Sequence, residues 1–305
     1  MFVDSELEGL RQQTIEENEK LRPLIENRKF HTRTVAEARL LTLAETTLED
    51  ATDISIPSPN GSIVIHTFSP PSPKGVYMHI HGGGWVIGSA FARDQKLFEI
   101  SQQTESVVVS VEYRLAPENP YPSGADDCEI AATWLLENSE KNWGTSQIVI
   151  GGESAGAHLA AVTALRLRNE HALYKKIVGL NLVYGVFDLS MTPSQKLGKD
   201  KLVIPTETLE WFFNHYLQSN ESRTSPDISP LYADLSELPP ALLTVGTQDP
   251  LLDDSLFMAM RLRAAGNEAT LDIYPEALHG FTVLPGTAAT VANERANQFI
   301  SSCWS

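Results

Sequence analysis

Five residues near the middle of this 305-residue chain, Gly152-Glu153-Ser154-Ala155-Gly156, have the types and spacing that covalent catalysis needs. They follow the apolar run 148–150 and open a helical pattern, so the sequence predicts a strand, a sharp turn and a helix. In a G-x-S-x-G elbow the glycines permit a strained turn that exposes the serine hydroxyl. Free N–H groups at the helix start favour the negative charge of an acyl-transfer intermediate. Ser154 is therefore the candidate nucleophile, and the alternative is a tight turn with an incidental serine.

A second motif, His79-Ile80-His81-Gly82-Gly83-Gly84-Trp85, follows a predicted strand over 76–80. Three successive glycines leave backbone N–H groups uncovered, and such a loop can aim them at a developing oxyanion. A phosphate-binding loop would instead need a following Lys and Ser or Thr, which residues 85–88 lack. We expect the His81 side chain to bond the loop backbone and not to exchange protons.

A serine hydroxyl needs a base to remove its proton and a carboxylate to orient that base. His279 is the candidate base, because it lies in a loop directly after a predicted strand over 269–274. Two acids follow predicted strands, Asp249 after 241–245 and Asp188 after 177–184. Asp253 and Asp254 are expected to cap or solvate the next helix, and His158 to be packed inside one.

Together these motifs resemble the hormone-sensitive lipase-like family of α/β-hydrolases, the bacterial-type carboxylesterases. The segment Tyr113-Arg114-Leu115-Ala116-Pro117-Glu118 looks like a further motif of that family, and the resemblance runs from about residue 70 to the C-terminus. The sequence departs from the family pattern at Glu153, where Asp is more usual, and at Ala157-His158, where Gly-Asn is more usual.

The resemblance implies a catalytic triad of Ser154, Asp249 and His279, with oxyanion donors at the backbone N–H groups of Gly83, Gly84 and Ala155. The order serine, aspartate, histidine along the chain is that of α/β-hydrolases and favours Asp249 over Asp188. The family's Asp-Pro-Leu also matches residues 249–251. No cofactor or metal is needed for this chemistry.

Composition sets limits on partners. The chain has 42% hydrophobic and 20% charged residues, typical of a globular protein, and a formal net charge of −16. That charge disfavours nucleic acid and stable association with anionic membranes. The partner that the family resemblance implies is a small-molecule ester substrate. Cys128 and Cys303 are expected to be free thiols. The N-terminus lacks the pattern of a secretory leader, so a cytoplasmic location is expected, and the oligomeric state is left open between monomer and homodimer.

Strands and helices alternate from residue 51 onward, which predicts an α/β-hydrolase fold with a mostly parallel central sheet flanked by helices, preceded by an antiparallel hairpin at Asn60-Gly61. Residues 1–50 look helical, with capping boxes at Ser5 and Thr34, and the first helix is expected to end or kink near Leu21, before Pro23. The predicted organisation is a helical cap segment (1–50), a first part of the catalytic domain (51–188), a cap insertion (189–225) and a second catalytic part (226–305).

The sequence therefore predicts a serine carboxylesterase acting on short- to medium-chain acyl esters. Aromatic residues at the glycine loop and in the cap insertion are expected either to bound the acyl pocket or to form core packing between the cap and the catalytic domain: Trp85, Trp211, Phe212 and Phe213. The alternatives are an amide hydrolase such as an arylformamidase, and a non-catalytic receptor like the plant gibberellin receptors, which share the family resemblance but lack its histidine.

Overall fold

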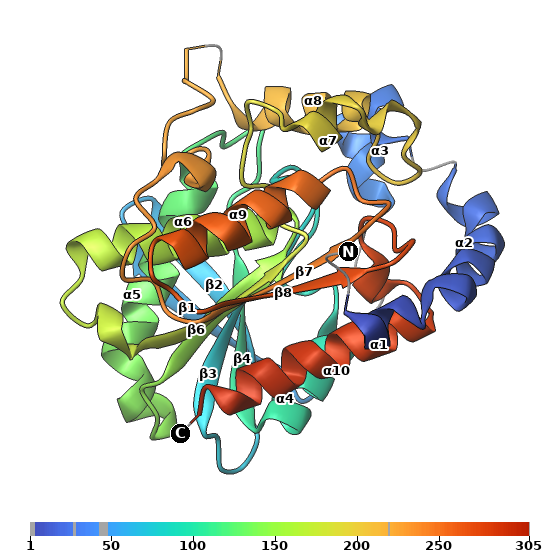
Figure 1. The fold of residues 1–305 in the computed structure, drawn as a ribbon. Coiled ribbons are helices and arrows are strands. Elements are labelled where there is room, and N and C mark those ends of the chain that lie inside the picture. The colour runs from blue at the N-terminus through green and yellow to red at the C-terminus, as the bar shows by residue number, and fades with distance from the viewer. Residues whose placement is uncertain (1–3, 27–28, 43–47, 219, 305) are drawn as a thin grey trace.

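One mixed sheet forms the centre of the protein (Figure 1). The computed structural model describes residues 4–26, 29–42, 48–218 and 220–304, and within them eight strands pair in the order β1-β2-β4-β3-β5-β6-β7-β8. The β1–β2 and β2–β4 pairs are antiparallel and the others parallel, which confirms the predicted hairpin and mostly parallel sheet. The strands are β1 (Thr52–Ser58), β2 (Gly61–Phe68), β3 (Gly75–Ile80), β4 (Ser106–Glu112), β5 (Ile148–Glu153), β6 (Ile177–Val183), β7 (Ala241–Gly246) and β8 (Ala269–Tyr274).

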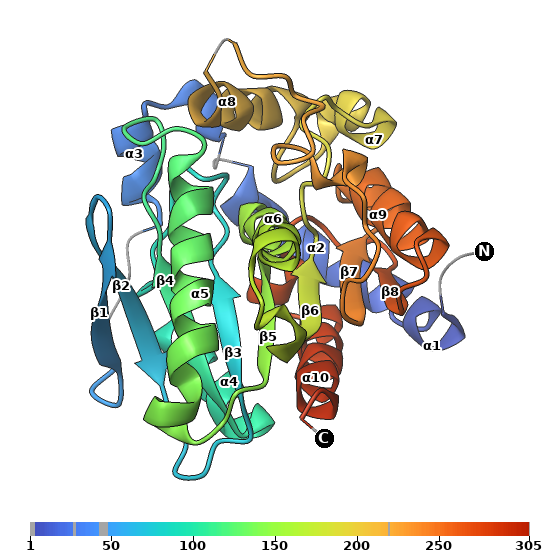
Figure 2. The ribbon, with the colours of Figure 1, turned by 90° about the vertical axis from the view of Figure 1, so that its left-hand side faces the viewer.

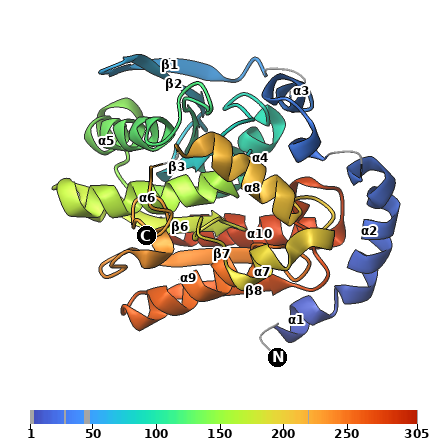
Figure 3. The same ribbon diagram turned by 90° about the horizontal axis from the view of Figure 1, so that it is seen from above.

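Helices cover both faces of this sheet, as the view from above shows (Figure 3). One face carries α5 (Ser123–Trp143), α6 (Ala155–Glu170) and α9 (Leu252–Ala264), and the other carries α4 (Asp94–Thr104) and α10 (Thr287–Ser302). Every residue of β3 and of β7 is buried, because helices exclude water from both sides of the sheet. This is why the central strands are near-continuous apolar runs. No helix in the described part of the chain is both long and apolar enough to span a bilayer.

Three short helices lie above the carboxyl ends of the parallel strands, where the catalytic elbow is (Figure 2). They are α3 (Val35–Leu40), α7 (Pro193–Lys196) and α8 (Thr206–Tyr216). The buried residues of α8 recur at helical spacing on its inner face: Thr208, Leu209, Phe212, Phe213 and Tyr216. Single-turn 3₁₀ helices complete the chain: η1 (Phe30–Thr32), η2 (Tyr174–Lys176), η3 (Gly198–Asp200), η4 (Pro230–Tyr232) and η5 (Phe281–Val283).

The N-terminal segment divides between two places. Its first helix, α1 (Ser5–Glu8), packs beside β8, where Leu7 is fully buried in one cluster with Tyr274 (Figure 2). Helix α3 lies above the sheet, and the single turn at Phe30–Thr32 packs against α8 there. The capping box predicted at Thr34 is confirmed by its hydrogen bonds with Glu37, whereas α1 is capped by Asp4 and not by Ser5. The predicted helical pattern over 35–48 runs into residues 43–47, which lie outside the described residues.

The sequence predicts that the first helix ends or kinks near Leu21, and the structure shows no end there. Helix α2 runs from Arg11 to Ile25 with Pro23 in its last turn. Proline removes one helical N–H, which leaves the carbonyl of Glu19 without its donor. Because Glu19 is exposed, water can satisfy that carbonyl, and the helix continues for two more residues.

Candidate active site

Ser154 occupies the turn between β5 and α6. Its φ of +56° and ψ of −118° lie outside the regions that ordinary residues prefer, which is the strained turn that the motif predicts. Gly152 and Gly156 flank it, and a Cβ atom at either position would overlap the carbonyl of Ile80 on the adjacent β3. The glycines therefore let the elbow pack against β3 while the serine side chain stays free.

The structure brings the three predicted triad residues together. The Nε2 atom of His279 lies 3.0 Å from the Ser154 hydroxyl oxygen, and its Nδ1 atom lies 2.8 Å from a carboxylate oxygen of Asp249. The other carboxylate oxygen of Asp249 accepts a hydrogen bond from the Leu251 N–H at 2.8 Å. The ring of Tyr184 packs edge-on against that of His279 at 4.8 Å. This chain of contacts is arranged for proton transfer from the serine to the imidazole.

Asp188, the competing acid, points elsewhere. Its carboxylate accepts hydrogen bonds from the N–H and hydroxyl of Ser190 and from the hydroxyl of Tyr232 at 3.2 Å. It makes no contact with His279 in the described structure, so of the two acids only Asp249 can orient that ring.

The glycine loop places uncovered amides beside the serine. Gly83 has φ of +114° and Gly84 of +57°, which glycine adopts readily and other residues rarely do. The carbonyl of Gly83 accepts hydrogen bonds from Val86 and Ile87, which closes the loop into a tight turn. Among the described residues, the N–H groups predicted as oxyanion donors have no hydrogen-bond acceptor: Gly83, Gly84 and Ala155.

Arg39, on α3, supports this loop from the N-terminal segment. Its Nε donates to the Val86 carbonyl at 2.9 Å, and one terminal nitrogen donates to the Ala116 carbonyl, also at 2.9 Å. Both terminal nitrogens bind the carboxylate of Glu118, at 2.9 and 2.7 Å. One side chain thus ties the glycine loop to the neighbouring loop after β4, a contact across 47 residues for which the sequence gives no signal.

Two histidines near the site serve the structure, as the sequence predicted. His81 Nδ1 bonds the Gly82 carbonyl at 2.7 Å, and its ring stacks on Tyr113 at 4.2 Å. His158 accepts a hydrogen bond from the Trp85 indole at 3.1 Å and donates to the Ile228 carbonyl at 2.8 Å. Burial lowers the pKa of both histidines to about 4, so both stay neutral near pH 7.

A cavity of about 210 Å³ opens onto Ser154 and His279. The glycine loop lines this cavity, together with four apolar side chains from the segments above the sheet: Phe30, Val203, Ile204 and Phe212. Phe212 is the only one of the four aromatics predicted as pocket walls that lines this cavity in the described structure. Phe30 comes from η1, and Val203 and Ile204 come from a loop; the sequences of both segments carry no signal of this role.

Trp85, Trp211 and Phe213 do not line the cavity, which corrects the sequence prediction. Trp85 is buried beneath α8, stacked on Tyr216 at 4.3 Å. Phe213 is fully buried and faces Trp85, and Trp211 packs edge-on against Phe212 at 5.0 Å. Successive helical residues point about 100° apart, so residues 211, 212 and 213 cannot all face one cavity.

Two acids expected at the start of α9 as caps or solvated groups instead hold the cap insertion. Asp254 is fully buried and accepts four hydrogen bonds, from the N–H groups of Phe187 and Asp188 and from the side chains of Thr192 and Gln195. Burial raises the pKa of Asp254 to about 7 against the effect of these donors. Asp253 accepts a hydrogen bond from the Ser194 N–H at 2.8 Å.

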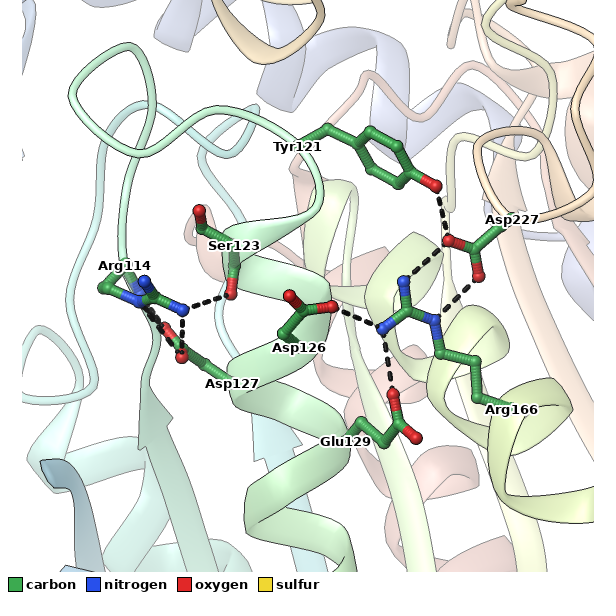
Figure 4. A network of polar contacts seen from close by, with 8 residues as sticks. All are labelled: Arg114, Tyr121, Ser123, Asp126, Asp127, Glu129, Arg166 and Asp227. Atoms are coloured by element: carbon green, nitrogen blue, oxygen red, sulfur yellow. Dashed lines mark hydrogen bonds and ion pairs between the residues drawn. The ribbon is translucent and has the colours of Figure 1, made fainter. Parts of the chain in front are cut away.

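Arg166, on α6, anchors the chain where it returns from the cap insertion (Figure 4). Its guanidinium donates to the two carboxylate oxygens of Asp227 at 2.7 and 2.6 Å. It also donates to one carboxylate oxygen each of Asp126 and Glu129 on α5, at 2.9 Å in both cases. The hydroxyl of Tyr121 donates to Asp227 at 2.6 Å. Figure 4 shows these groups converging on one guanidinium, which fixes residue 227 next to the His158–Ile228 contact.

Comparison with known proteins gives the same class as the site. A family model described as an α/β-hydrolase fold matches residues 77–283. The carboxylic ester hydrolase LipN of Mycobacterium tuberculosis is 33% identical over 258 residues, covering 80% of this chain and 68% of that protein. An acetyl esterase of Salmonella paratyphi A is 28% identical over 231 residues, covering 74% and 72%.

A solved structure is also similar. An esterase of Pyrobaculum calidifontis aligns with a TM-score of 0.82 and 29% identity, over 93% of this chain and 97% of that one. The chain therefore belongs to the α/β-hydrolase fold family, within its hormone-sensitive lipase-like branch of carboxylic-ester hydrolases.

Proposed function

We propose that this carboxylic-ester hydrolase is a serine esterase that works through an acyl-enzyme, with Ser154 as nucleophile, His279 as base and Asp249 as the orienting acid. The observation that carries the proposal is the hydrogen-bonded chain of these three side chains, at 3.0 and 2.8 Å, which faces a cavity lined by the glycine loop.

In the first half-reaction the Ser154 oxygen attacks the ester carbonyl carbon while His279 Nε2 takes the hydroxyl proton. Asp249 accepts the Nδ1 hydrogen bond and so keeps Nε2 free as the base. The amides of Gly83, Gly84 and Ala155 hold the carbonyl oxygen as it becomes negative. The tetrahedral intermediate collapses, His279 gives the proton to the departing alcohol, and water then attacks the acyl-enzyme through the same steps.

Short- to medium-chain acyl groups, roughly C2 to C8, fit the cavity best. Each buried CH₂ of an acyl chain contributes about 0.8 kcal/mol until the walls are reached. Here the apolar side chains of Ile204 and Phe212 line a cavity of about 210 Å³, and we expect longer acyl chains to meet them. The name of the Salmonella relative, acetyl esterase, supports the lower end of this range. We propose that α3 and residues 189–225 act as the cap that closes this cavity.

Two alternative functions predict different experimental outcomes from the esterase. An amide hydrolase such as an arylformamidase would use the same triad, and a preference for amides over matched esters would favour it. A non-catalytic receptor is disfavoured because His279 lies within hydrogen-bond distance of Ser154. A cytoplasmic location and a homodimer stay predictions.

The test is a series of 4-nitrophenyl esters of increasing acyl length with one matched anilide, assayed on wild type and three variants. Ser154→Ala should lower kcat by about 10⁴-fold or more while the protein stays folded. Asp249→Asn should lower kcat far more than the matched control Asp188→Asn, because only Asp249 bonds His279. Equal losses at the two aspartates would remove Asp249 from its proposed role, and a preference for C16 over C4 esters would refute the size range.

A further inference from the structure

Two basic side chains at the start of α4, Arg93 and Lys96, lie where the catalytic cavity meets an outer groove. The groove has a volume of about 900 Å³ and runs between the beginnings of α4 and α10. Arg93 and Val283 line both the cavity and the groove, and Lys96 lines the groove. Arg93 is the only lysine or arginine that lines the catalytic cavity within the described ranges.

Arg93 has hydrogen-bonding capacity that no neighbour uses. One of its terminal nitrogens, Nη1, is buried and has no hydrogen-bond acceptor among the described residues. Its ion-pair partner is Glu153, whose Oε1 atom lies 3.6 Å from that nitrogen, beyond hydrogen-bond distance. The other carboxylate oxygen of Glu153 is bonded to His79 at 3.1 Å. A buried donor without an acceptor is costly, so this position favours an added oxygen acceptor.

Lys96 is partly buried and forms no hydrogen bond or ion pair in the part of the chain that the structure describes. Burial lowers the pKa of Lys96, and the charges of Glu99 and Glu153 act in the opposite direction. The nearby carboxylates are engaged elsewhere: Glu99 accepts from Gln95 at 2.8 Å, and Asp94 binds His66 at 3.0 Å and the Leu48 N–H at 2.9 Å. Three carboxylates, Glu153, Asp94 and Glu99, face these two cations, so the corner has no excess positive charge and the case for a subsite depends on the unpaired donors of Arg93 and Lys96.

We infer that Arg93 and Lys96 form a carboxylate-binding subsite, and that the substrates include esters that carry a free carboxylate besides the ester group. This rests on the proposed esterase function and names its substrate class. A guanidinium matches a carboxylate with two parallel hydrogen bonds, and partial burial strengthens the pairing. Because Arg93 borders both the cavity and the groove, a carboxylate bound there belongs to a substrate whose ester lies at Ser154.

The experiment compares charged and neutral substrates of the same shape. For a carboxylate on the acyl side, the pair is the 4-nitrophenyl monoester of succinate and its neutral methyl ester. For a carboxylate on the alcohol side, the pair is 4-acetoxybenzoate and its methyl ester. The measured quantity is the ratio of kcat/KM for the charged substrate to kcat/KM for its neutral partner. It is measured in wild type, Arg93→Met, Arg93→Lys and Lys96→Met. The control is Lys175→Met, because the side chain of Lys175 is exposed and pairs with Glu237.

In at least one pair, Arg93→Met should lower the ratio by about tenfold or more, as expected when charge-assisted hydrogen bonds are lost. Arg93→Lys should keep part of the preference, Lys96→Met should lower the ratio by about twofold to fivefold, and Lys175→Met should leave it unchanged. Raising the salt to about 0.5 M should lower the wild-type ratio. A ratio unchanged in Arg93→Met for both pairs overturns the inference.

The neutral esters separate this inference from the proposed function. If wild type hydrolyses them and the ratio ignores Arg93, the esterase stands and the subsite does not. If wild type hydrolyses no ester, the subsite is tested by measuring ligand binding to Ser154→Ala by titration calorimetry. The subsite requires monomethyl succinate to bind more tightly than dimethyl succinate. Equal affinities overturn the inference.

Discussion

Replacing Gly83 with alanine tests whether the glycine loop stabilises the oxyanion. Gly83 has φ of +114°, and a Cβ atom there would lie well under 3.0 Å from the carbonyl oxygen of Ile87, closer than Cβ atoms come in folded proteins. That atom belongs to the backbone, so no side-chain rotation relieves the overlap. The loop must move, and with it the N–H of Gly83, a residue that lines the cavity.

Gly61, in the β1–β2 turn, is the matched control because its φ of +122° is nearly the same and nothing lies within 4 Å of a Cβ built there. Both substitutions carry the backbone strain of a positive φ, about 1–3 kcal/mol of unfolding free energy. Only Gly83→Ala adds the overlap and displaces a proposed oxyanion donor, whose loss costs about 10²–10³ in kcat.

The assay measures kcat and KM for 4-nitrophenyl butyrate and the unfolding free energy in urea for wild type and both variants. We expect Gly61→Ala to lose stability and keep its kcat, and Gly83→Ala to lose kcat by at least about a hundredfold. Circular dichroism at the assay temperature shows that each variant is folded. A folded Gly83→Ala protein with kcat within about threefold of Gly61→Ala would refute the oxyanion role of this loop.

Three further outcomes follow from contacts around the site. Burial lowers the pKa of His158 to about 4, below the roughly 6.5 of an unfolded imidazole. As the pH falls, His158 is therefore protonated in the unfolded chain before it is protonated in the folded one. Wild type should lose unfolding free energy as the pH falls from about 6.5 to 4. His158→Gln retains one hydrogen-bond donor and one acceptor, and its unfolding free energy, measured by urea titration, should fall less steeply with pH than that of wild type, by up to roughly 1.4 kcal/mol per pH unit. Identical pH slopes in the two proteins would contradict this. Arg39→Met should lower kcat more than it raises KM, with Arg39→Lys intermediate, because Arg39 holds the Val86 carbonyl of the glycine loop; a pure KM effect would exclude this positioning role. Phe212→Ala should shift the optimum toward longer acyl chains, whereas Phe213→Ala, buried away from the cavity, should leave it in place; the ester series measures both.

The sequence alone determined the turns, caps and strand ends that depend only on residues close together along the chain. The elbow is a strand, a turn and a helix within a few residues, and its glycines and apolar run carry all the information that such a turn needs. Strand β8 matches its predicted range at both ends, because turn residues and a change of periodicity bound it. The hairpin at Gly61 and the capping box at Thr34 are determined in the same way.

Only the tertiary structure decided what depends on packing between distant segments. It brings His279 to Ser154 across 125 residues and ties Asp254 to the cap insertion, and neither contact has a local signature. Helical periodicity shows that α8 is amphipathic but not which neighbour each side of it meets, so Phe212 borders the cavity while Trp211 and Phe213 do not. The physical reason is that burial and contact are properties of the assembled chain: a residue type states what it can bond or bury, and the fold decides which partner is within reach.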